Sequence, residues 1–347
     1  MRSFIGNLRH VCLMLVGGLP AACALSEPRA LAQALDPAPQ QLRVMTWNVE
    51  WMFDDYQGDN RSQLAREQSA PTAEYWQSKL SGVVEVLAAH PAEIVALQEI
   101  EGSQTLRAIC QRLQDEHQLS YRYAFIEGSD GFTEQDVGLL VRSGLWSYRR
   151  HEQSQVMFDS RNYFQLSKHL VAELRWDQLD SPLTVMNVHL RARPEVAPIR
   201  VRQARLMRVW LQPLLEAGQD VIVVGDLNAE RPVPQPLAQG ADDDELAVLA
   251  GDQPESALVD LLTYLPDPQQ ATHAVLDEQF DRILVSPSLL RDDPGVDWCF
   301  QSIVVLDEAT IRGAADGPGH WDQRLRLPPE ELDLSDHFPV LATFERK

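Results

Sequence analysis

The sequence places polar and ionisable side chains at the ends of short apolar runs that have the length and composition of β-strands. Each of these side chains comes directly after such a run or directly before one. The members of the set are Asn48, Glu50, Glu99, His189, Asp226, Asn228, Asp281, Asp336 and His337. Ligands in α/β folds bind at strand ends, so we expect the set to meet at one rim of the sheets if the last strands run opposite to the earlier ones.

This combination of side chains suits one kind of chemistry. Carboxylates, amides and two histidines, without a thiolate, form a hard, oxygen-rich set that fits Mg²⁺, Mn²⁺ or Ca²⁺. Carboxylates brought together repel one another unless a cation or a proton lies among them. A bound metal could polarise a phosphoryl oxygen while a histidine–carboxylate pair moves protons. The set therefore predicts hydrolysis of a phosphodiester or a phosphomonoester.

Taken alone, each residue of the set also has a structural interpretation. Asp226 and Asn228 could close a turn through side-chain hydrogen bonds. His189 by itself would more often be a satisfied histidine at the end of a strand than a catalyst. The complete set, in order along the chain, outweighs these interpretations. It does not do so for three other histidines, which we interpret as structural: His90, His169 and His273.

The pattern between these positions predicts one α/β domain that positions the set. Apolar runs predict strands at 41–49, 94–97, 137–141, 169–174, 183–190, 221–224, 280–285, 303–306 and 338–344. Helical spacing predicts helices at 76–87, 201–215 and 256–265, and one that begins at an N-cap, Ser103. We expect two packed mixed sheets flanked by helices, because the strands outnumber the helices and are β-branched. Segments 232–254 and 314–334, rich in Pro, Gly and acidic residues, predict surface loops.

Six short motifs, in order, resemble those of the endonuclease/exonuclease/phosphatase superfamily, which has the deoxyribonuclease I-like fold. They are Thr46-Trp47-Asn48-Val49-Glu50, Leu97-Gln98-Glu99, Asn187-Val188-His189-Leu190, Gly225-Asp226-Leu227-Asn228, Phe280-Asp281-Arg282-Ile283 and Ser335-Asp336-His337-Phe338-Pro339. Each motif alone is common, whereas six in order are specific. The resemblance spans about 41–347 and implies an α/β, four-layer sandwich of two mixed sheets between helices.

The resemblance also implies a metal site. Glu99, with Asn48 and Asp336 nearby, would hold the principal Mg²⁺, and Glu50 would add a contact through water. Mn²⁺ and Ca²⁺ are the alternatives to Mg²⁺.

The remaining residues of the set take catalytic roles by the same resemblance. Asp281 would orient His337, the candidate base or phosphate-polarising imidazole. Asp226 would position or deprotonate the attacking water, and Asn228 would hydrogen-bond the phosphoryl oxygens. Which of Asp226 and His337 takes the proton stays open. His189 would protonate or stabilise the leaving oxygen, as in the deoxyribonuclease and sphingomyelinase branches that it resembles.

Three cationic residues are candidates for contact with the substrate phosphate. Arg191 adjoins His189, and a phosphate contact and a solvated side chain are equally open for it. Lys168 and Arg142 are the other two candidates, and their placement near the phosphate is loose. Asp136, which opens the predicted strand 137–141, could either orient His189 or be a solvated acid at the edge of a sheet.

Length, composition and charge bound these interpretations. The chain has 347 residues, 44% apolar and 23% charged, which excludes collagen-like, low-complexity and wholly disordered classes. Thirty Lys and Arg against 51 Asp and Glu give a net charge of −21 at pH 7. Such a charge argues against nucleic-acid binding by bulk electrostatics. It leaves room for a local cationic groove or for bound divalent metals.

The first 34 residues predict a secretory signal peptide. Arg2 and Arg9 precede an apolar stretch at 11–25, and the small residues of Ala30-Leu31-Ala32-Gln33-Ala34 follow it. A transmembrane helix would need roughly 20 apolar residues. This stretch is shorter and is interrupted by glycine and proline. We therefore expect export to the periplasm or the cell exterior, and no transmembrane helix in the mature chain.

Processing of this segment leaves one alternative open. We expect cleavage after Ala32 or Ala34 and a mature domain at 35–347, whereas lipidation at Cys23 is the lesser alternative. Of the remaining cysteines, Cys110 falls on the apolar face of a helical pattern, and we interpret it as a buried free thiol. Pairing of Cys110 with Cys299 stays open.

Three classes of function follow. The leading interpretation is an exported, divalent-metal-dependent phosphodiesterase that hydrolyses DNA or RNA, with no obligate protein partner. The first alternative is a phosphatase or phospholipase of the same superfamily, acting on sphingomyelin or on an inositol or sugar phosphate. Segment 314–334 weakens its membrane-active version, because it contributes Trp321 but is otherwise charged. A non-catalytic binding protein on the same fold is the second alternative, and the complete polar set argues against it.

Overall fold

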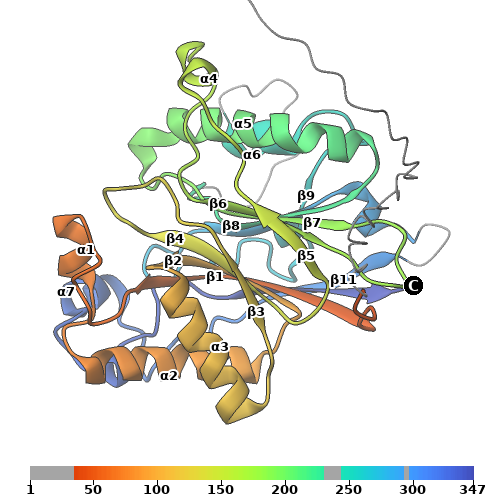
Figure 1. Ribbon diagram of the computed structural model, residues 1–347. Helices are drawn as coiled ribbons and strands as arrows, with labels where there is room; N and C mark the ends of the chain where they lie inside the picture. Colours follow the sequence, from red (N-terminus) through yellow and green to blue (C-terminus); the bar gives the residue numbers. More distant parts are fainter. Residues whose placement is uncertain (1–34, 230–243, 293–296) are drawn as a thin grey trace, which may run out of the picture. The chain divides into compact units, whose positions relative to one another are not determined.

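The apolar runs of the sequence form β-strands in the computed structural model, which describes residues 35–229, 244–292 and 297–347 (Figure 1). Within these residues, twelve strands pair into two sheets of six. All of them belong to one unit, Leu35–Lys347. The predicted signal peptide, with its cleavage sites and Cys23, lies outside the described residues.

The first sheet has the order β11-β12-β1-β2-β4-β3. Its strands are β1 (Gln41–Met52), β2 (Ile94–Ile100), β3 (Arg122–Phe125), β4 (Asp136–Val141), β11 (Trp298–Val305) and β12 (Val340–Arg346). Only the central pair, β1 and β2, is parallel, with Asn48 opposite Gln98. The carboxyl ends of these two strands therefore lie side by side, and they carry Asn48, Glu50 and Glu99.

The second sheet has the order β5-β6-β7-β8-β10-β9. Its strands are β5 (Leu145–Arg149), β6 (His169–Leu174), β7 (Leu183–His189), β8 (Asp220–Asp226), β9 (Val259–Asp260) and β10 (Asp281–Val285). β7 and β8 are parallel and end with His189 opposite Asp226. β10 is antiparallel to β8 and places Asp281 opposite Asp226. The prediction of two mixed sheets is therefore confirmed.

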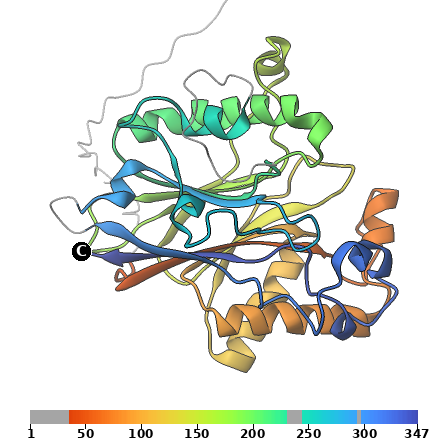
Figure 2. The ribbon, with the colours of Figure 1, turned by 180° about the vertical axis from the view of Figure 1, so that it is seen from behind.

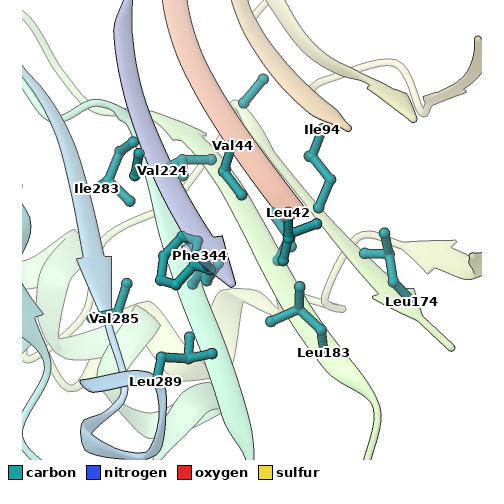
Figure 3. Close-up of a cluster of buried hydrophobic side chains, with 14 of the residues drawn as sticks. Leu42, Val44, Ile94, Leu174, Leu183, Val224, Ile283, Val285, Leu289 and Phe344 are labelled. Atoms are coloured by element: carbon teal, nitrogen blue, oxygen red, sulfur yellow. The ribbon is translucent and has the colours of Figure 1, made fainter. Parts of the chain in front are cut away.

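The apolar sides of the two sheets face each other and form the central core (Figure 3). Leu42, Val44 and Ile94 come from the first sheet, and Val224 and Ile283 from the second; all five are fully buried. Burying such a side chain contributes about 1.5–3 kcal/mol relative to leaving it exposed. This layer holds the strands, and with them the polar residues at their ends.

Helices cover the outer face of each sheet and complete a four-layer sandwich (Figures 1 and 2). On β1 of the first sheet, Trp47 shares a buried cluster with Val84 of one helix, and on β7 of the second, Val188 shares another with Met207. The covering helices are α2 (Ala73–Ala89), α3 (Ser103–His117), α5 (Ala197–Glu216) and α6 (Glu245–Ala250). No helix among the described residues is both long and apolar enough to cross a membrane.

Shorter elements lie in the connections. They are α1 (Gln63–Gln68), α4 (Gln155–Asp159), α7 (His320–Gln323), and the 3₁₀ turns η1 (Pro194–Val196), η2 (Leu261–Tyr264), η3 (Pro287–Leu290), η4 (Gly317–Gly319) and η5 (Pro329–Glu331). The segment predicted as a loop at 314–334 thus contains η4, α7 and η5. Of the segment predicted as a loop at 232–254, residues 232–243 lie outside the described residues and α6 occupies part of the rest.

Two predictions of local structure are wrong. Residues 256–265 form β9 and η2 instead of a helix, because the backbone of Asp260 pairs with β10 and its carboxylate contacts Arg282. Tertiary pairing there overrides the helical pattern. Helix α3 begins at Ser103 itself, and its N-cap is Gly102. Cys110, on α3, is a free thiol, as is Cys299, and both are partly exposed rather than buried.

Candidate active site

A hydrogen bond between Asn48 and Asp226 joins the two sheets at the rim where β1, β2, β7 and β8 end. Nδ2 of Asn48, on β1, donates to Oδ2 of Asp226, at the end of β8, over 3.0 Å. The same amide lies 3.5 Å from Nε2 of His337. Because each pair of parallel strands ends here, the polar residues of both sheets converge on Asp226.

His337, which precedes β12, is held by Asp281. Its Nδ1 lies 2.7 Å from Oδ2 of Asp281, and both side chains are buried. Burial disfavours the imidazolium, but the carboxylates of Asp281, Asp336 and Asp226 outweigh it and raise the pKa of His337 well above its ordinary value. The ring is therefore protonated at neutral pH. Its Nε2 faces the centre of the site, 3.8 Å from oxygens of both Asp226 and Asp336.

His189, the last residue of β7, has the opposite protonation state. Its Nε2 lies 3.4 Å from Oδ2 of Asp226 and 3.9 Å from Oε1 of Glu99. Burial, with the positive charges of Lys168 and His337, lowers the pKa of His189 well below its ordinary value. The ring is neutral at pH 7, and we assign its proton to Nε2, the nitrogen that faces the carboxylates.

Asp136 does not orient His189. Its Oδ1 accepts a hydrogen bond of 2.7 Å from the backbone N–H of Gly128. Among the described residues, no group hydrogen-bonds Nδ1 of His189, which is buried. The position of the His189 ring is therefore set by β7, which carries the residue, and by the carboxylates of Asp226 and Glu99, which face its Nε2.

Asp226 accepts hydrogen bonds on both of its oxygens. Besides the amide of Asn48, the backbone N–H of Asn228 donates to Oδ1 over 2.9 Å. Burial raises the pKa of Asp226 to about 6, against the opposing effect of the His337 charge. The carboxylate is thus ionised at neutral pH but close to its titration range. Asn228 also closes the turn, because its φ is 50° and its Nδ2 donates to the carbonyl of Leu190.

Glu99 and Asp336 form the carboxylate side of the site. Glu99 has a left-handed backbone, with φ of 61°, and its Oε2 accepts from the N–H of Trp51 over 3.0 Å. Burial, with repulsion from Asp336, raises the pKa of Glu99 to about 7. A divalent cation would relieve this repulsion, and carboxylate and amide oxygens are ligands that such cations prefer. The residues Glu99, Asp336 and Asn48 therefore fit a metal of the Mg²⁺ class.

Glu50 has partners that sequence reasoning missed. Its Oε2 lies 2.7 Å from Nε2 of His320, and its Oε1 lies 3.4 Å from Nε of Arg324. Burial opposes its charge, but the His320 hydrogen bond and the Arg324 and Lys79 charges lower the pKa of Glu50 to about 2. Glu50 is thus a buried ion-pair partner. No motif in the sequence marks His320 or Arg324, which lie in the segment interpreted as a surface loop.

Both ring nitrogens of His320 have a carboxylate partner. Its Nδ1 lies 2.9 Å from Oδ2 of Asp316, opposite the contact with Glu50. Burial disfavours its charge, yet the hydrogen bond and charge of Glu50 raise its pKa to about 9. Asp316, His320 and Asp333 bring ligand atoms within 4.8 Å of one another. Both nitrogens of His320 are already engaged, so we interpret this cluster as a brace for the segment.

His273, interpreted from the sequence as structural, lies against the site. Its ring centroid is 4.5 Å from that of His337. Its Nδ1 accepts from the backbone N–H groups of Val275 and Leu276, and its Nε2 lies 3.7 Å from Oδ2 of Asp336. Burial, with the charge of His337, lowers the pKa of His273 to about 3. The ring is neutral, and it supports both the loop at 273–276 and the Asp336–His337 pair.

The three predicted substrate-binding cations lie in different places. Lys168 is buried near the site, where its Nζ donates to Gln135 over 2.8 Å and lies 3.4 Å from Asp130. Arg191 follows β7 at the rim and is exposed. The prediction for Arg142 is wrong. It follows β4 at the end of the sheet opposite Glu99, because β2 and β4 are antiparallel, and it pairs with Glu93 at 3.4 Å.

A pocket of about 280 Å³ opens beside the carboxylates of Glu99 and Asp336. Its wall includes Trp51 and two residues of the segment around α7, Trp321 and Arg324. The indole N–H of Trp321 donates to Oδ2 of Asp336 over 2.7 Å. The segment that holds Glu50 therefore also contacts Asp336.

Comparison with solved structures identifies the fold. Humanized D. rerio TDP2, carrying 14 mutations, is 19% identical, with 88% of this chain and 100% of that chain covered and a TM-score of 0.52. The human Nocturnin catalytic domain with bound sulfate is 16% identical, with coverage of 90% and 97% and a TM-score of 0.52. An endonuclease/exonuclease/phosphatase from Beutenbergia cavernae is 15% identical, with coverage of 89% and 72% and a TM-score of 0.53.

The sequence itself identifies the family. No curated protein matches the chain. The sequence model of the Endonuclease/Exonuclease/phosphatase family matches residues 45–337, which contain every residue of the converging set. Because this match covers most of the chain and the fold agrees with it, the chain belongs to the Endonuclease/Exonuclease/phosphatase family and is a metal-dependent phosphoric ester hydrolase.

Proposed function

We propose that this protein is an exported phosphodiesterase that hydrolyses nucleic acid, DNA or RNA, with Mg²⁺ as its metal. The observation that carries the proposal is the pair of imidazoles on either side of Asp226. His189 is neutral and His337 is protonated, and their Nε2 atoms lie 3.4 and 3.8 Å from the same oxygen of Asp226. A diester has both an attacking and a leaving oxygen to assist, and this arrangement offers a different group to each.

The metal ligands are the first part of the proposed mechanism. Glu99, Asp336 and Asn48 would hold Mg²⁺, with Mn²⁺ or Ca²⁺ as alternatives, which when bound supplies a Lewis acid at a phosphoryl oxygen. Glu50 supports this group, because its backbone N–H donates to Oδ1 of Asn48 over 3.0 Å. Its side chain is paired with His320 and Arg324, and its contact to the metal through water stays a prediction.

Asp226 is the proposed base. It is ionised at pH 7, with a pKa of about 6, and accepts hydrogen bonds that orient its carboxylate. Asp226 would take a proton from water as the oxygen of that water attacks phosphorus. His337 is already protonated, so it cannot take that proton. His337 would instead donate a hydrogen bond from Nε2 to a phosphoryl oxygen. The Asp281 carboxylate, 2.7 Å from Nδ1, would stabilise the positive charge of the imidazolium.

We assign stabilisation of the leaving oxygen to His189. As the bond from phosphorus to the leaving oxygen breaks, the Nε2–H of His189 would stabilise the departing alkoxide by a hydrogen bond, and the alkoxide would then take its proton from solvent water. Asn228 would hydrogen-bond the phosphoryl group. Lys168 contributes positive charge from within the site, and Arg191 is the exposed candidate for a flanking phosphate.

Two further observations support a nucleic-acid substrate. D. rerio TDP2, 19% identical with a TM-score of 0.52, has been solved with a single-strand DNA product. The segment around α7 carries one exposed tryptophan, Trp321, between charged residues. A membrane-active hydrolase would expose a larger apolar surface.

The activity test compares substrates side by side. The purified protein should be incubated with plasmid DNA, RNA, bis-p-nitrophenyl phosphate and sphingomyelin, each with Mg²⁺, Mn²⁺ or Ca²⁺. We expect cleavage of DNA or RNA that EDTA and His337→Ala abolish, and that the surface change His117→Ala retains. Intact nucleic acid with hydrolysed sphingomyelin would favour the phospholipase alternative, and no hydrolysis of any of these substrates would refute the nuclease proposal.

Export has its own test. Full-length protein expressed in a bacterial host should be recovered from the periplasm or medium with a new N-terminus at Gln33 or Leu35. A replacement of both Arg2 and Arg9 by glutamate should retain the protein in the cytoplasm. Full-length protein in the cytoplasm of cells carrying the unchanged sequence would refute export, and a lipidated Cys23 at the N-terminus would favour the anchored form.

A further inference from the structure

The pocket beside Glu99 and Asp336 has aromatic walls that catalysis as proposed does not use. Trp51 comes from the end of β1, and Trp321 from α7. α1 and α7 lie side by side in both views (Figures 1 and 2), and Gln68 of α1 lines the same pocket. The pocket thus combines two indole rings and one amide with the metal-binding carboxylates.

The backbone directs Trp51 away from the regular course of its strand. Glu50 and Trp51 have φ of 48° and 45°, and the register of β1 shifts between Asn48 and Met52. Consecutive left-handed residues other than glycine are unfavourable, and such strain clusters at functional sites. Phe53 packs edge-on against the ring of Trp51, with the two centroids 5.3 Å apart, and the guanidinium carbon of Arg324 lies over the Trp51 ring, 6.0 Å from its centroid.

Trp321 is exposed but held in place. Its indole N–H is engaged by Asp336, whereas 46% of the residue remains accessible to solvent. A tryptophan fixed at one edge presents its face without the loss of side-chain entropy that a free ring would incur on binding. Trp51 and Trp321 therefore both line the pocket beside the metal-binding residues, each held in place by neighbouring side chains.

The charges of the pocket select what can stack there. Glu50, Glu99 and Asp336 line it and repel a phosphate, while Arg324 is committed to Glu50. A neutral planar ring meets no such repulsion, and the Gln68 amide can both donate to and accept from its edge. A nucleobase has these properties, and bases stack on aromatic side chains with little regard to sequence.

We propose that Trp51 and Trp321 form a subsite that binds the nucleobase next to the scissile phosphate. This inference rests on the proposed nuclease function and adds to it the part of the substrate that the enzyme recognises. A base held in this pocket anchors the strand beside Glu99 and Asp336. The subsite thereby supplies affinity that the strongly acidic chain does not supply through charge.

The test separates stacking from chemistry. Short single strands with one cleavable phosphodiester, all other linkages being methylphosphonates, are made with either a base or an abasic tetrahydrofuran residue on each side of that bond. We expect wild-type kcat/KM to be about 5- to 150-fold higher with the base on one of the two sides, the range of one stacked base. Trp51→Leu should bring this ratio close to 1, mainly through KM.

Variants at Trp321 distinguish the ring from its hydrogen bond. Trp321→Phe keeps a ring and loses the N–H, so it should retain most of the ratio while lowering kcat/KM for both strands. Trp321→Leu should lose the ratio as well. Trp146→Leu, the same change at an exposed tryptophan on β5, is the control and should keep the wild-type ratio.

Two outcomes would refute the subsite alone, and a third would refute the proposed nuclease function together with the subsite. Equal cleavage of base-bearing and abasic strands by the wild type, or a ratio unchanged in both leucine variants, refutes stacking while the nuclease assignment stands. No cleavage of any strand with Mg²⁺, Mn²⁺ or Ca²⁺ refutes the nuclease assignment and the subsite with it. Binding of the same strands to His337→Ala protein, which needs no turnover, should show the same preference for the base.

Discussion

At the scale of single residues, protonation state separates the proposed roles. Asp226 and His337 were interchangeable as candidate bases, and their surroundings distinguish them. Burial raises the pKa of Asp226 only to about 6, which leaves an ionised base at neutral pH. The three carboxylates around His337 outweigh burial and raise its pKa well above the ordinary value, which leaves an acid. Pairs of groups whose pKa values are moved apart in this way are typical of acid–base sites.

A pH profile follows from this assignment. kcat/KM should rise through an apparent pKa near 6, as Asp226 ionises, and fall only at high pH, as His337 loses its proton. In Asp281→Asn the carboxylate that most raises the pKa of His337 is gone. The alkaline fall should then move to lower pH, and activity at pH 8 should decrease about 10²-fold or more. Asp115→Asn, on the exposed side of α3, should leave both limbs unchanged. An alkaline limb that stays in place in Asp281→Asn would contradict the assignment.

A second prediction at this scale concerns Glu99 without metal. Its folded pKa of about 7 exceeds the model-compound value of 4.5, so the native state binds more protons than the unfolded state between these pH values. The Glu99 contribution to stability is therefore lost as pH rises from about 4.5 to 7. In EDTA at pH 7.5, Glu99→Gln should be more stable than wild type by about 1–3 kcal/mol, and the two should converge near pH 4.5.

Urea denaturation at both pH values measures this difference. Mg²⁺ should stabilise the wild type by mass action and stabilise Glu99→Gln far less. Glu85→Gln, the same change on the exposed face of α2, controls for loss of negative charge. Equal stabilisation of wild type and Glu99→Gln by Mg²⁺ would remove Glu99 from the metal site.

At the scale of elements, strand ends deliver the chemistry and one connection braces it. The parallel pairs β1–β2 and β7–β8 end at a common rim, which brings Asn48 to Asp226. The segment of η4 and α7 then contacts two members of the set from outside the sheets. His320 binds Glu50, and Trp321 binds Asp336. This segment is therefore part of the site even though the sequence predicts a loop there.

The brace predicts strong coupling between Glu50 and His320. His320→Gln leaves the buried Glu50 and the partly buried Asp316 with weaker partners, and it should destabilise the protein by about 3 kcal/mol or more. Glu50→Gln should also destabilise it, because the His320 imidazolium loses its carboxylate. In the double variant the two losses should be less than additive, and a urea-denaturation double-mutant cycle measures the difference. Additive losses would show that the pair is not a unit.

At the scale of the whole molecule, charge and fold act in opposite directions on a nucleic-acid substrate. The net charge of −21 repels polyphosphate on average. The sandwich concentrates its carboxylates around a site that fits a divalent cation, so attraction there depends on metal rather than on a basic surface. The exposed Arg191 at the rim and the buried Lys168, which lies 3.4 Å from Asp130, are the candidate cations for contact with phosphate.

A weak salt dependence follows. Each phosphate contact by a basic side chain contributes about −0.9 to the slope of log affinity against log salt for duplex DNA. With two candidate contacts, the slope of log kcat/KM between 50 and 200 mM salt at fixed Mg²⁺ should be no steeper than about −2. Arg191→Gln should make the slope shallower by about 1, and Arg142→Gln, at the opposite end of the sheet, should leave it unchanged. A steeper slope would show that further basic side chains contact the phosphates.

The sequence by itself determined which residues could do the chemistry and that they would stand at the ends of strands. The reason is local. Apolar runs of strand length predict β1, β2, β7, β8 and β10, and a polar residue that directly follows or precedes such a run must lie at one end of the strand. The order of six motifs then indicated the family and its sandwich. Where a local pattern competed with tertiary pairing, as at 256–265, the prediction was wrong.

Only the tertiary structure decided how these residues are paired and protonated. Glu50 and His320 are 270 positions apart, and no local pattern relates them. Arg142 was a loosely placed candidate for contact with the substrate phosphate, and the antiparallel pairing of β2 and β4 carries it to the far end of the sheet. Burial and neighbouring charge depend on all the elements packed around a group, so pKa values, and with them the choice between Asp226 and His337, emerge only once the sheets have closed on each other.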